Sequence, residues 1–484
     1  MIITIMMILL TVISVPLGAE AFNSGPDLNA VDEFLQETVA LYRIPGLSIA
    51  IVNEEEVLYT FSSGQASSAA EVGPDTPFLL GSTSKMFTAL AVMQLVEQGK
   101  IELDAPVQKY LPEFQLARPE YQDQITVRHL LHHTSGLSQK GMPGTTFGED
   151  NLEQELVSLR QCIPDTPPGE RYLYFNPNYR LLGLIIERVS NKQYGEFLNE
   201  EIFRPLAMTS TFAGPEGVKG LARGHGQLFG YPLPRKQVFR PGALPSGYLV
   251  SSASDIARFL MAELRAGGGQ PGLLNPETVK ATWTPPDGKN EGYAMGWLVA
   301  NDSADERVLL HGGALENYQS FFCLIPQRKI GFAFLLNQGG LLPMLSFNAV
   351  RDGLLQIING EQAITQSVRW PVIIVSAIFL FFLGIELWRT LRLKSWLLRT
   401  ARHKPWRRRF NILFELVGPT FLLFGLHPLM NRIMGDQMDW SMLYSLLPEL
   451  FFILVIAIGL GFIRGFSKIW LLKGKLPRNV QDSA

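Results

Sequence analysis

The sequence predicts an α/β domain, an antiparallel sheet flanked by helices plus a helical insertion, followed by three transmembrane α-helices. Three observations support this. β-rich runs occur at both ends of the first 360 residues, and helical patterns with long Pro/Gly loops fill 82–290 between them. Three apolar stretches then lie near 368–388, 410–430 and 442–463, each about long enough to cross a bilayer. With 484 residues, the chain has room for both parts.

The strands of the sheet are predicted from alternating and β-branched runs. The stretch "GLSIAIVNEEEVLYTFSSG", 46–64, contains two such runs around Asn53 and Glu54, which predicts a hairpin. Four further strand patterns follow between 292 and 337: "GYAMGWLVA", "RVLLHGG", "YQSFFCLIP" and "KIGFAFLLN". Helices are expected at 30–43 and 344–358. The sheet is therefore expected to combine strands from the two ends of the domain.

The two ends of the chain predict export and anchoring. Residues 1–21 are apolar as far as Leu17 and end in Ala19-Glu20-Ala21, which predicts a signal peptide. No Lys or Arg precedes the apolar run, so an uncleaved anchor stays an alternative. Residues 389–409 hold nine Lys/Arg and no acid, and such loops stay in the cytoplasm.

We therefore expect a multi-pass protein of the cell membrane with its C-terminus in the cytoplasm. An extracytoplasmic domain (22–360) is followed by a linker (361–370), three membrane helices (371–465) and a basic cytoplasmic tail (466–484). The third helix is interrupted by Glu449 after Pro448. That acid either lies near the outer interface or is functional with His427 as its partner.

Charge and cysteine content restrict the function classes. A net charge of −2 gives no broad electrostatic case for nucleic acid. The only cysteines are Cys162 and Cys323. Export permits a disulfide between them. Cys323, however, stands in a strand pattern, which favours a buried free thiol.

The stretch "FLLGSTSKMFTAL", 78–90, is the first candidate site, because Ser82 precedes Lys85 by about one helical turn. A serine hydroxyl needs a base to act as nucleophile, and a buried, neutral lysine can be that base. At a helix N-terminus, the Ser82 N–H could also hold a developing oxyanion. A Ser-x-x-Lys pattern arises roughly once by chance in a chain of this length, so alone it does not identify a site.

Two further patterns contain candidate residues. In "YLYFNPNYRLLGLIIERVS", Tyr174 can relay a proton if nearby cations favour its phenolate, and Asn176 can bind a peptide-like amide. Asn176 before Pro177 is also a good helix N-cap, and both roles can hold. In "LLHGGALENYQSFF", His311-Gly312-Gly313 joins two strand patterns. Glycines there let a backbone edge approach a ligand, although a plain turn is the alternative.

Taken together, the three motifs resemble those of the serine β-lactamases of the cephalosporinase type and the penicillin-binding D-amino-acid peptidases. This chain has "STSK" at 82, "YFN" at 174 and "HGG" at 311, and "ITVRHLLHHTSGL" also fits. The resemblance spans about 30–358 and implies the two-subdomain serine β-lactamase-like fold. The membrane helices resemble two branches: penicillin-binding-protein-like envelope proteins, and peptidases that remove an acyl-D-asparagine from prodrugs.

The resemblance implies a role for each residue. Ser82 would be the acylating nucleophile, Lys85 its neutral partner, and Tyr174 the group that passes the proton to the leaving nitrogen. The expected substrate-binding residues are Asn176, His311, Gly312, Gly313 and Ala314, with the N–H groups of Ser82 and Ala314 forming an oxyanion hole.

The expected activity is that of a serine peptidase or amidase on peptides or small molecules bearing a D-amino acid, with no cofactor. His311-Gly312 stands where antibiotic-binding relatives often carry Lys-Thr. A substrate carboxylate should therefore be held weakly unless Arg223 or Arg240 substitutes. The alternatives are a β-lactamase or esterase of the same fold, and a catalytically silent envelope protein.

A metal site is the weakest alternative. His129, His132 and His133 lie close together in sequence, but no glutamate separates them as in H-E-x-x-H. We expect these histidines to pack or cap, and we expect no metal. The sequence does not predict an oligomeric state.

Overall fold

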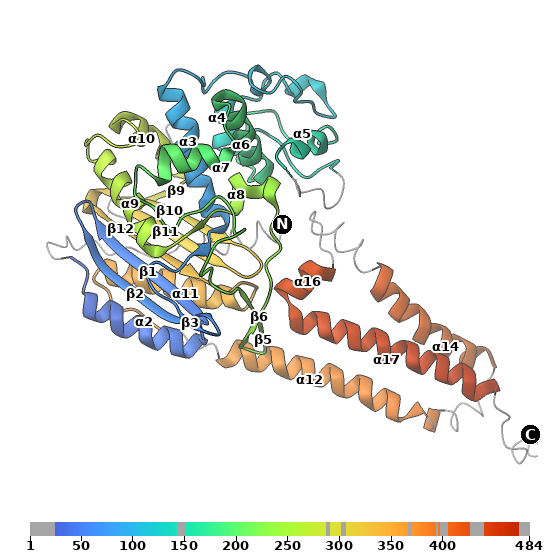
Figure 1. Ribbon diagram of the computed structural model, residues 1–484. Coiled ribbons are helices and arrows are strands. Elements are labelled where there is room, and N and C mark those ends of the chain that lie inside the picture. Colours follow the sequence, from blue (N-terminus) through green and yellow to red (C-terminus); the bar gives the residue numbers. More distant parts are fainter. Residues whose placement is uncertain are drawn as a thin grey trace, which may run out of the picture. The chain divides into compact units, whose positions relative to one another are not determined.

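The computed structural model describes residues 25–142, 151–286, 291–301, 306–365, 369–393, 395–396, 405–425 and 440–473. The chain divides into two compact units (Figure 1). One comprises the described parts of 3–227 and 231–366, and the other those of 367–484 together with 228–230. The predicted signal peptide, 1–21, lies outside the described residues and stays a prediction.

Within the described residues, the first unit is built on an eight-stranded antiparallel sheet of order β3-β2-β1-β12-β11-β10-β9-β8. β1 pairs with β12, so the two ends of the unit meet in one sheet, which confirms the prediction. The strands are β1 (Gly46–Asn53), β2 (Val57–Ser67), β3 (Ala70–Glu71), β8 (Gly292–Tyr293), β9 (Leu298–Asn301), β10 (Arg307–Ala314), β11 (Gln319–Ile325) and β12 (Ile330–Leu336).

The stretch "GYAMGWLVA" differs from the prediction, because it forms two short paired strands, β8 and β9. Gly296 has a φ of +81°, and Ala294 N–H bonds to Trp297 O, so the chain turns tightly between them. A positive φ at this position favours glycine.

Helices cover both faces of the sheet (Figure 1). Every residue of β11 and β12 is buried, as expected for strands with no solvent-exposed face. On one face lie α2 (Leu28–Tyr42) and α11 (Pro343–Ile358), which contact each other, with Phe347 of α11 packed on Phe321 and Phe334. On the other, α9 (Ala253–Gly267) packs against β1 and β12.

The helical insertion is centred on α3 (Ser84–Glu97), which is buried from Ser84 to Leu95 and contacts α6, α7, α8 and α10. The helices around it are α4 (Val127–Leu131), α5 (Glu153–Leu159), α6 (Asn176–Ser190), α7 (Tyr194–Leu198), α8 (Leu244–Gly247) and α10 (Pro276–Thr282). Shorter pieces are β4 (Phe78–Leu79), β5 (His225–Leu228), β6 (Tyr231–Pro234), β7 (Val250–Ser251), η1 (Gly81–Thr83), η2 (Val107–Lys109), η3 (Pro119–Tyr121), η4 (Asn199–Phe203), η5 (Pro241–Ala243) and η7 (Pro326–Arg328).

Two further details of the fold were left open by the sequence. Within the region of long Pro/Gly loops expected between 82 and 290, β5 and β6 form a hairpin, because Phe229 and Gly230 both adopt positive φ as tight hairpin turns require. Cys162 and Cys323 are both buried and unpaired, so the free-thiol alternative is confirmed and the disulfide is wrong.

The second unit contains α12 (Arg369–Leu391), α14 (Pro405–Thr420), η8 (Phe421–Gly425), α16 (Trp440–Leu446) and α17 (Pro448–Lys473). Two stretches among the described residues are long and apolar enough to cross a membrane: Val372–Leu391 and Pro448–Leu471, with mean hydropathies of 2.1 and 2.2.

The two apolar helices correspond to the first and third predicted spans. The middle predicted span, 410–430, is therefore not confirmed. It falls on α14 and η8, and 426–430 lie outside the described residues. α14 is short, starts in a basic stretch and carries Glu415, which pairs with Arg464 and Lys468 of α17.

The last span begins later than predicted. α16 ends at Leu446, and Pro448 opens α17, which continues to Lys473 rather than ending near 463. Proline lacks an N–H and disrupts a helix interior, but it fits the first helical position. Glu449 consequently lies in the first turn of α17, where the helix dipole favours an acid.

Candidate functional site

Ser82 lies in the turn η1, directly before α3. Gly81 has a φ of +60°, which lets the chain turn sharply from β4 into η1. Thr83 Oγ1 bonds to Leu80 O at 3.0 Å and lies 2.8 Å from Ser320 Oγ of β11. The turn is thus held between the helical insertion and the sheet, while Ser82 itself is only half-buried.

Lys85 reaches Ser82 from the first turn of α3. Its Nζ lies 3.2 Å from Ser82 Oγ, and it donates to Asn176 Oδ1 at 2.8 Å and to the Ser246 carbonyl at 2.6 Å. Lys85 is fully buried, and this burial, reinforced by the positive charge of Arg180, lowers its pKa well below the usual range. In the neutral form that this shift favours, the amine would use its two N–H groups for the two carbonyl-type oxygens and turn its lone pair toward the Ser82 hydroxyl.

Tyr174 completes the group around the serine hydroxyl by donating its O–H to Ser82 Oγ at 2.9 Å. Lys85 Nζ lies 4.9 Å from the centre of its ring. The sequence analysis made proton relay conditional on nearby cations that favour the phenolate, but burial raises the pKa of Tyr174 well above its usual value. The bond to Ser82 and the charge of Arg180 oppose this only partly. Tyr174 therefore rests as a neutral phenol able to donate a proton.

Asn176 does not cap helix α6. The helix begins at Asn176 itself, the N-cap is Phe175, and no side chain caps it. Pro177 still occupies the first turn, as its fixed φ favours. The Asn176 side chain is instead committed to Lys85, so the N-cap interpretation is wrong and the amide oxygen serves the site.

Strand β10 extends beyond its neighbour β9, which pairs only with Arg307–Leu310 in the described sheet. Turn η1 packs against β10. Leu315 N–H bonds to Tyr318 O. Because the N–H groups of successive residues in an antiparallel strand point to opposite sides, the Ala314 N–H points away from β11. A Cβ at Gly81 would lie 2.6 Å from Ala314 N, and one at Gly313 would lie 3.1 Å from Ser82 N. The two backbone segments thus approach closely enough for both N–H groups to serve one oxyanion.

His311 carries no positive charge at this edge. Its Nδ1–H donates to the Gly312 carbonyl at 2.8 Å, and its Nε2 therefore accepts from the Tyr293 hydroxyl at 3.1 Å. Burial, together with the charge of Lys85, lowers the pKa of His311 to about 3. His311 is therefore uncharged near pH 7. Gly312 follows it on the strand and is half-buried.

Arg223 and Arg240, the two arginines that could replace the lysine of the antibiotic-binding relatives, differ in their surroundings. Arg240 donates to the Tyr248 hydroxyl at 3.0 Å and pairs with Glu316 at 3.3 Å, so its charge is already engaged. Arg223 is exposed, with its backbone N–H bonded to Ala66 O.

Several residues of the site were not singled out in the sequence. The Ser246 carbonyl binds Lys85, Tyr293 binds His311, and Arg180 acts on Lys85 through its charge. Arg180 could have been found from spacing, because it follows Asn176 by four residues and so shares its face of α6. Ser246 contributes a backbone atom, for which the sequence carries no signal.

The three histidines of "HLLHHTSGL" have structural partners. His129 and Thr126 form a reciprocal cap at the start of α4. His132 Nδ1 donates to the Tyr293 carbonyl at 3.3 Å. His133 Nδ1 accepts from Phe175 N–H and Asn178 Nδ2, and its ring lies 4.4 Å from that of Tyr174. Within the described parts of the chain, no cluster of three or more His, Cys, Asp or Glu side chains is arranged to hold a metal.

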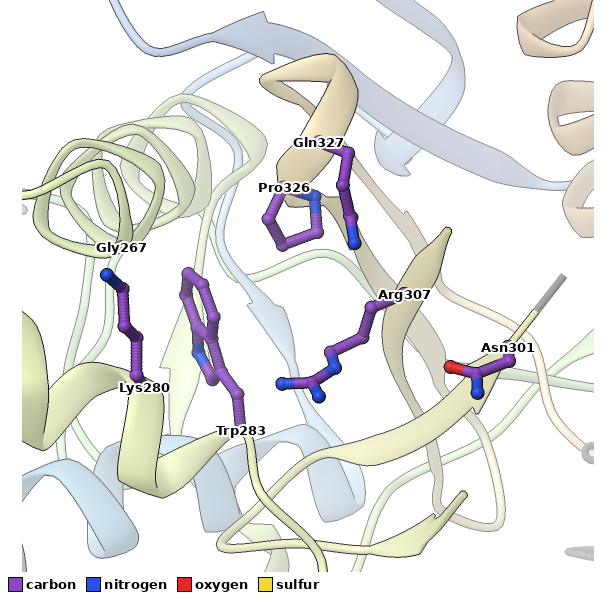
Figure 2. Close-up of a pocket in the computed structure, with 7 residues that line it drawn as sticks. All are labelled: Gly267, Lys280, Trp283, Asn301, Arg307, Pro326 and Gln327. Atoms are coloured by element: carbon purple, nitrogen blue, oxygen red, sulfur yellow. The ribbon is translucent and has the colours of Figure 1, made fainter. Parts of the chain in front are cut away.

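Two cavities of the first unit differ in their relation to the site. One, of about 560 Å³, is lined by Tyr172, Tyr293 and His132 among others, and Tyr293 connects it to His311. The other, of about 430 Å³, is shown in Figure 2. Trp283 lies there between Lys280 on one side and Arg307, Gln327 and Pro326 on the other, and none of these residues bonds to Ser82, Lys85 or Tyr174. Ser82, Lys85, Tyr174 and His311 line neither cavity, and the one beside Tyr293 is connected to His311 through the Tyr293 hydroxyl.

Comparison with known families and proteins agrees with this geometry. The Beta-lactamase family model matches residues 31–355. Protein flp of Staphylococcus aureus is 28% identical over 318 residues, which cover 63% of this chain and 62% of that protein. Unguisins hydrolase ungD' of Aspergillus campestris is 30% identical over 329 residues, covering 62% of this chain and 59% of that protein. The match thus spans about three fifths of each relative.

Solved structures share the fold. The octameric penicillin-binding protein homologue from Pyrococcus abyssi matches with a TM-score of 0.60 and 27% identity, covering 70% of this chain and 78% of that one. EstCE1, a hydrolase with promiscuous acyltransferase activity, matches with a TM-score of 0.55 and 24% identity, covering 67% of this chain and 98% of that one. The second likeness concerns the fold alone.

Proposed function

Because the chain belongs to the beta-lactamase family of serine hydrolases, we propose that it hydrolyses its substrate through an acyl-enzyme on Ser82. One observation carries the proposal: Ser82 Oγ is the meeting point of the Lys85 amine, at 3.2 Å, and the Tyr174 hydroxyl, at 2.9 Å. A buried amine with a depressed pKa next to a serine hydroxyl is the arrangement that serine activation requires.

The proposed reaction proceeds in two stages. Neutral Lys85 takes the Ser82 proton, and Oγ adds to the scissile carbonyl carbon, while the Ser82 and Ala314 N–H groups hold the oxyanion. Lys85 returns the proton through Tyr174 to the leaving nitrogen, the C–N bond breaks, and the amine departs. A water molecule then hydrolyses the ester, which releases the acid and restores the Ser82 hydroxyl.

We propose that the substrate is an amide beside a D-amino acid in a peptide. A neutral His311 followed by Gly312 offers neither an ammonium nor a hydroxyl to a substrate carboxylate. A charge-assisted hydrogen bond is worth about 1.5–3 kcal/mol, so β-lactams that depend on their carboxylate should bind more weakly by roughly tenfold to more than a hundredfold. The name of the Aspergillus relative, a hydrolase of unguisins, and the penicillin-binding homologue support acyl chemistry of this type.

We also propose that the catalytic unit is held outside the cytoplasm by C-terminal membrane helices. The two apolar helices Val372–Leu391 and Pro448–Leu471 support anchoring. The nine Lys/Arg of residues 389–409 favour a cytoplasmic position for the loop after the first helix. This arrangement would put the unit formed by 22–360 on the outer side.

The test of the nucleophile is labelling by a fluorophosphonate, read by intact-mass spectrometry and peptide mapping. We expect a single adduct on Ser82, lost in Ser82→Ala. Ser84→Ala is the matched control, because Ser84 lies two residues away and its Oγ accepts from Leu249 N–H instead of Lys85. Labelling at another residue, or a turnover-competent Ser82→Ala protein, would disprove the acyl-enzyme.

The substrate is tested by comparing kcat/KM for a chromogenic cephalosporin with values for acyl-D-Asn and D-Ala-D-Ala peptides. We expect a peptide to be preferred. If the cephalosporin is preferred by about tenfold or more, the β-lactamase alternative is correct and the interpretation of His311-Gly312 is wrong.

A further inference from the structure

A buried ion pair lies next to the nucleophile's base. Arg180 of α6 donates from Nη1 to Glu155 Oε2 of α5 at 2.8 Å, and the two side chains are 5% and 1% exposed. Arg180 Nε also donates to Ser246 Oγ at 3.3 Å. Ser246 is the residue whose carbonyl accepts from Lys85 at 2.6 Å. One residue therefore joins the ion pair to Lys85.

We propose that the Arg180–Glu155 pair sets the protonation state of Lys85, and with it the pH range in which Ser82 can be acylated. This inference rests on the proposed acyl-enzyme function and assigns Arg180 and Glu155 as positioning residues, since neither touches Ser82. Glu155 holds Arg180 in place, and the guanidinium charge keeps Lys85 in the neutral form that can accept a proton.

The direction in which the Arg180 charge moves the Lys85 pKa supports this proposal. The charge of Arg180 lowers the pKa of Lys85 in addition to burial, and it also opposes the rise in the pKa of Tyr174. It thus favours the proton-accepting form of both groups that contact Ser82 Oγ. A guanidinium remains charged throughout the accessible pH range, so this bias is permanent.

Other groups around Lys85 do not supply this charge. Burial lowers the pKa of His133 and His311 far enough to keep both neutral. Burial raises the pKa of the surrounding tyrosines, so they too are uncharged near neutral pH; these are Tyr172, Tyr174, Tyr179, Tyr248 and Tyr293. Among the described groups, Arg180 is thus the charged one that lowers the Lys85 pKa, and Glu155 is the carboxylate paired with it.

Arg180 and Glu155 carry opposite charges, so we expect their separate removal to move the Lys85 pKa in opposite directions, and this makes the inference testable. Arg180→Met removes a positive charge, so the Lys85 pKa should rise and the acid limb of Ser82 acylation should move to higher pH. Glu155→Gln removes a negative charge but keeps an oxygen that can accept from Arg180, so the acid limb should move to lower pH. Neighbouring charges shift pKa values by about 1–3 units, so we expect shifts of about one unit.

The measurement is the second-order rate of Ser82 labelling by the fluorophosphonate as a function of pH, on the full chain in detergent. Arg180→Lys is the matched control, because it keeps a positive charge and should keep a profile close to wild type. Melting temperatures are recorded in parallel, since loss of a buried pair lowers stability in either variant. If Arg180→Met does not fold, the downward shift in Glu155→Gln still tests the inference.

Opposite shifts of the acid limb support the inference. Shifts in the same direction, or two profiles that coincide with wild type, overturn it and leave the pair a structural one. If Ser82 of the wild-type protein is not labelled at any pH, the proposed function fails instead. The two failures are therefore distinguishable.

Discussion

Replacing Gly313 by alanine should push the Ser82 turn away from strand β10. A Cβ at this position would lie 2.0 Å from Leu80 O, 2.3 Å from Ser320 Oγ and 3.1 Å from Ser82 N. Leu80 O is a backbone atom and does not swing aside as a side chain can. Gly313 is not at positive φ, so the effect is steric and not conformational. Overpacking of this kind typically costs about 1–3 kcal/mol.

The displacement should reduce catalysis more than stability. It separates the N–H of Ser82 from that of Ala314, and loss of one oxyanion donor typically lowers kcat by about 10²–10³. The assay measures kcat for the preferred peptide and the melting temperature of the same preparation. We expect a rate loss of that order in a folded protein.

Gly331→Ala is the matched control on strand β12. A Cβ there would lie 2.7 Å from Leu324 Cδ2, the mobile end of a side chain remote from Ser82. It should lower the melting temperature with little change in kcat. If Gly313→Ala keeps wild-type kcat, or if both variants lose activity only in proportion to stability, close contact between η1 and β10 is not needed for catalysis.

Three further predictions concern the proton relay, a buried acid and the membrane topology. Tyr174→Phe keeps the ring packed on His133 but removes the O–H donated to Ser82, so kcat should fall by about 10²–10⁴ without loss of melting temperature. Burial raises the pKa of Glu263 to about 7 from 4.5, so the stability it contributes is full below about pH 4.5 and is lost as pH rises through about 7, a loss of about 3 kcal/mol. Glu263→Gln should thus melt at a higher temperature than wild type at about pH 8, with a smaller advantage at about pH 5; an advantage independent of pH would contradict this. A reporter active only outside the cytoplasm should work after residue 360 and within 431–440 but not within 395–405, and activity at the last position would refute the topology.

Local patterns were enough to locate most elements of the fold. The strands of residues 46–64 and 307–336 and the flanking helices appear where periodicity indicated, because each signal lies within a few residues of sequence. The exceptions have local backbone causes that weigh little in a sequence pattern: positive φ at Gly296 and at Phe229–Gly230, and a helix restart at Pro448.

The sequence by itself determined the chemical groups of the site: a serine and a lysine one turn apart, a tyrosine, an asparagine and a glycine-rich strand end. Only the tertiary structure decided their states. Lys85 meets Asn176 and the Ser246 carbonyl across 91 and 161 residues, and burial and the charge of Arg180 lower its pKa. Burial keeps His311 uncharged, and the Asn176 side chain bonds to Lys85 instead of capping α6. The reason is physical: protonation states depend on the local dielectric and on charges a few ångströms away, and folding sets both.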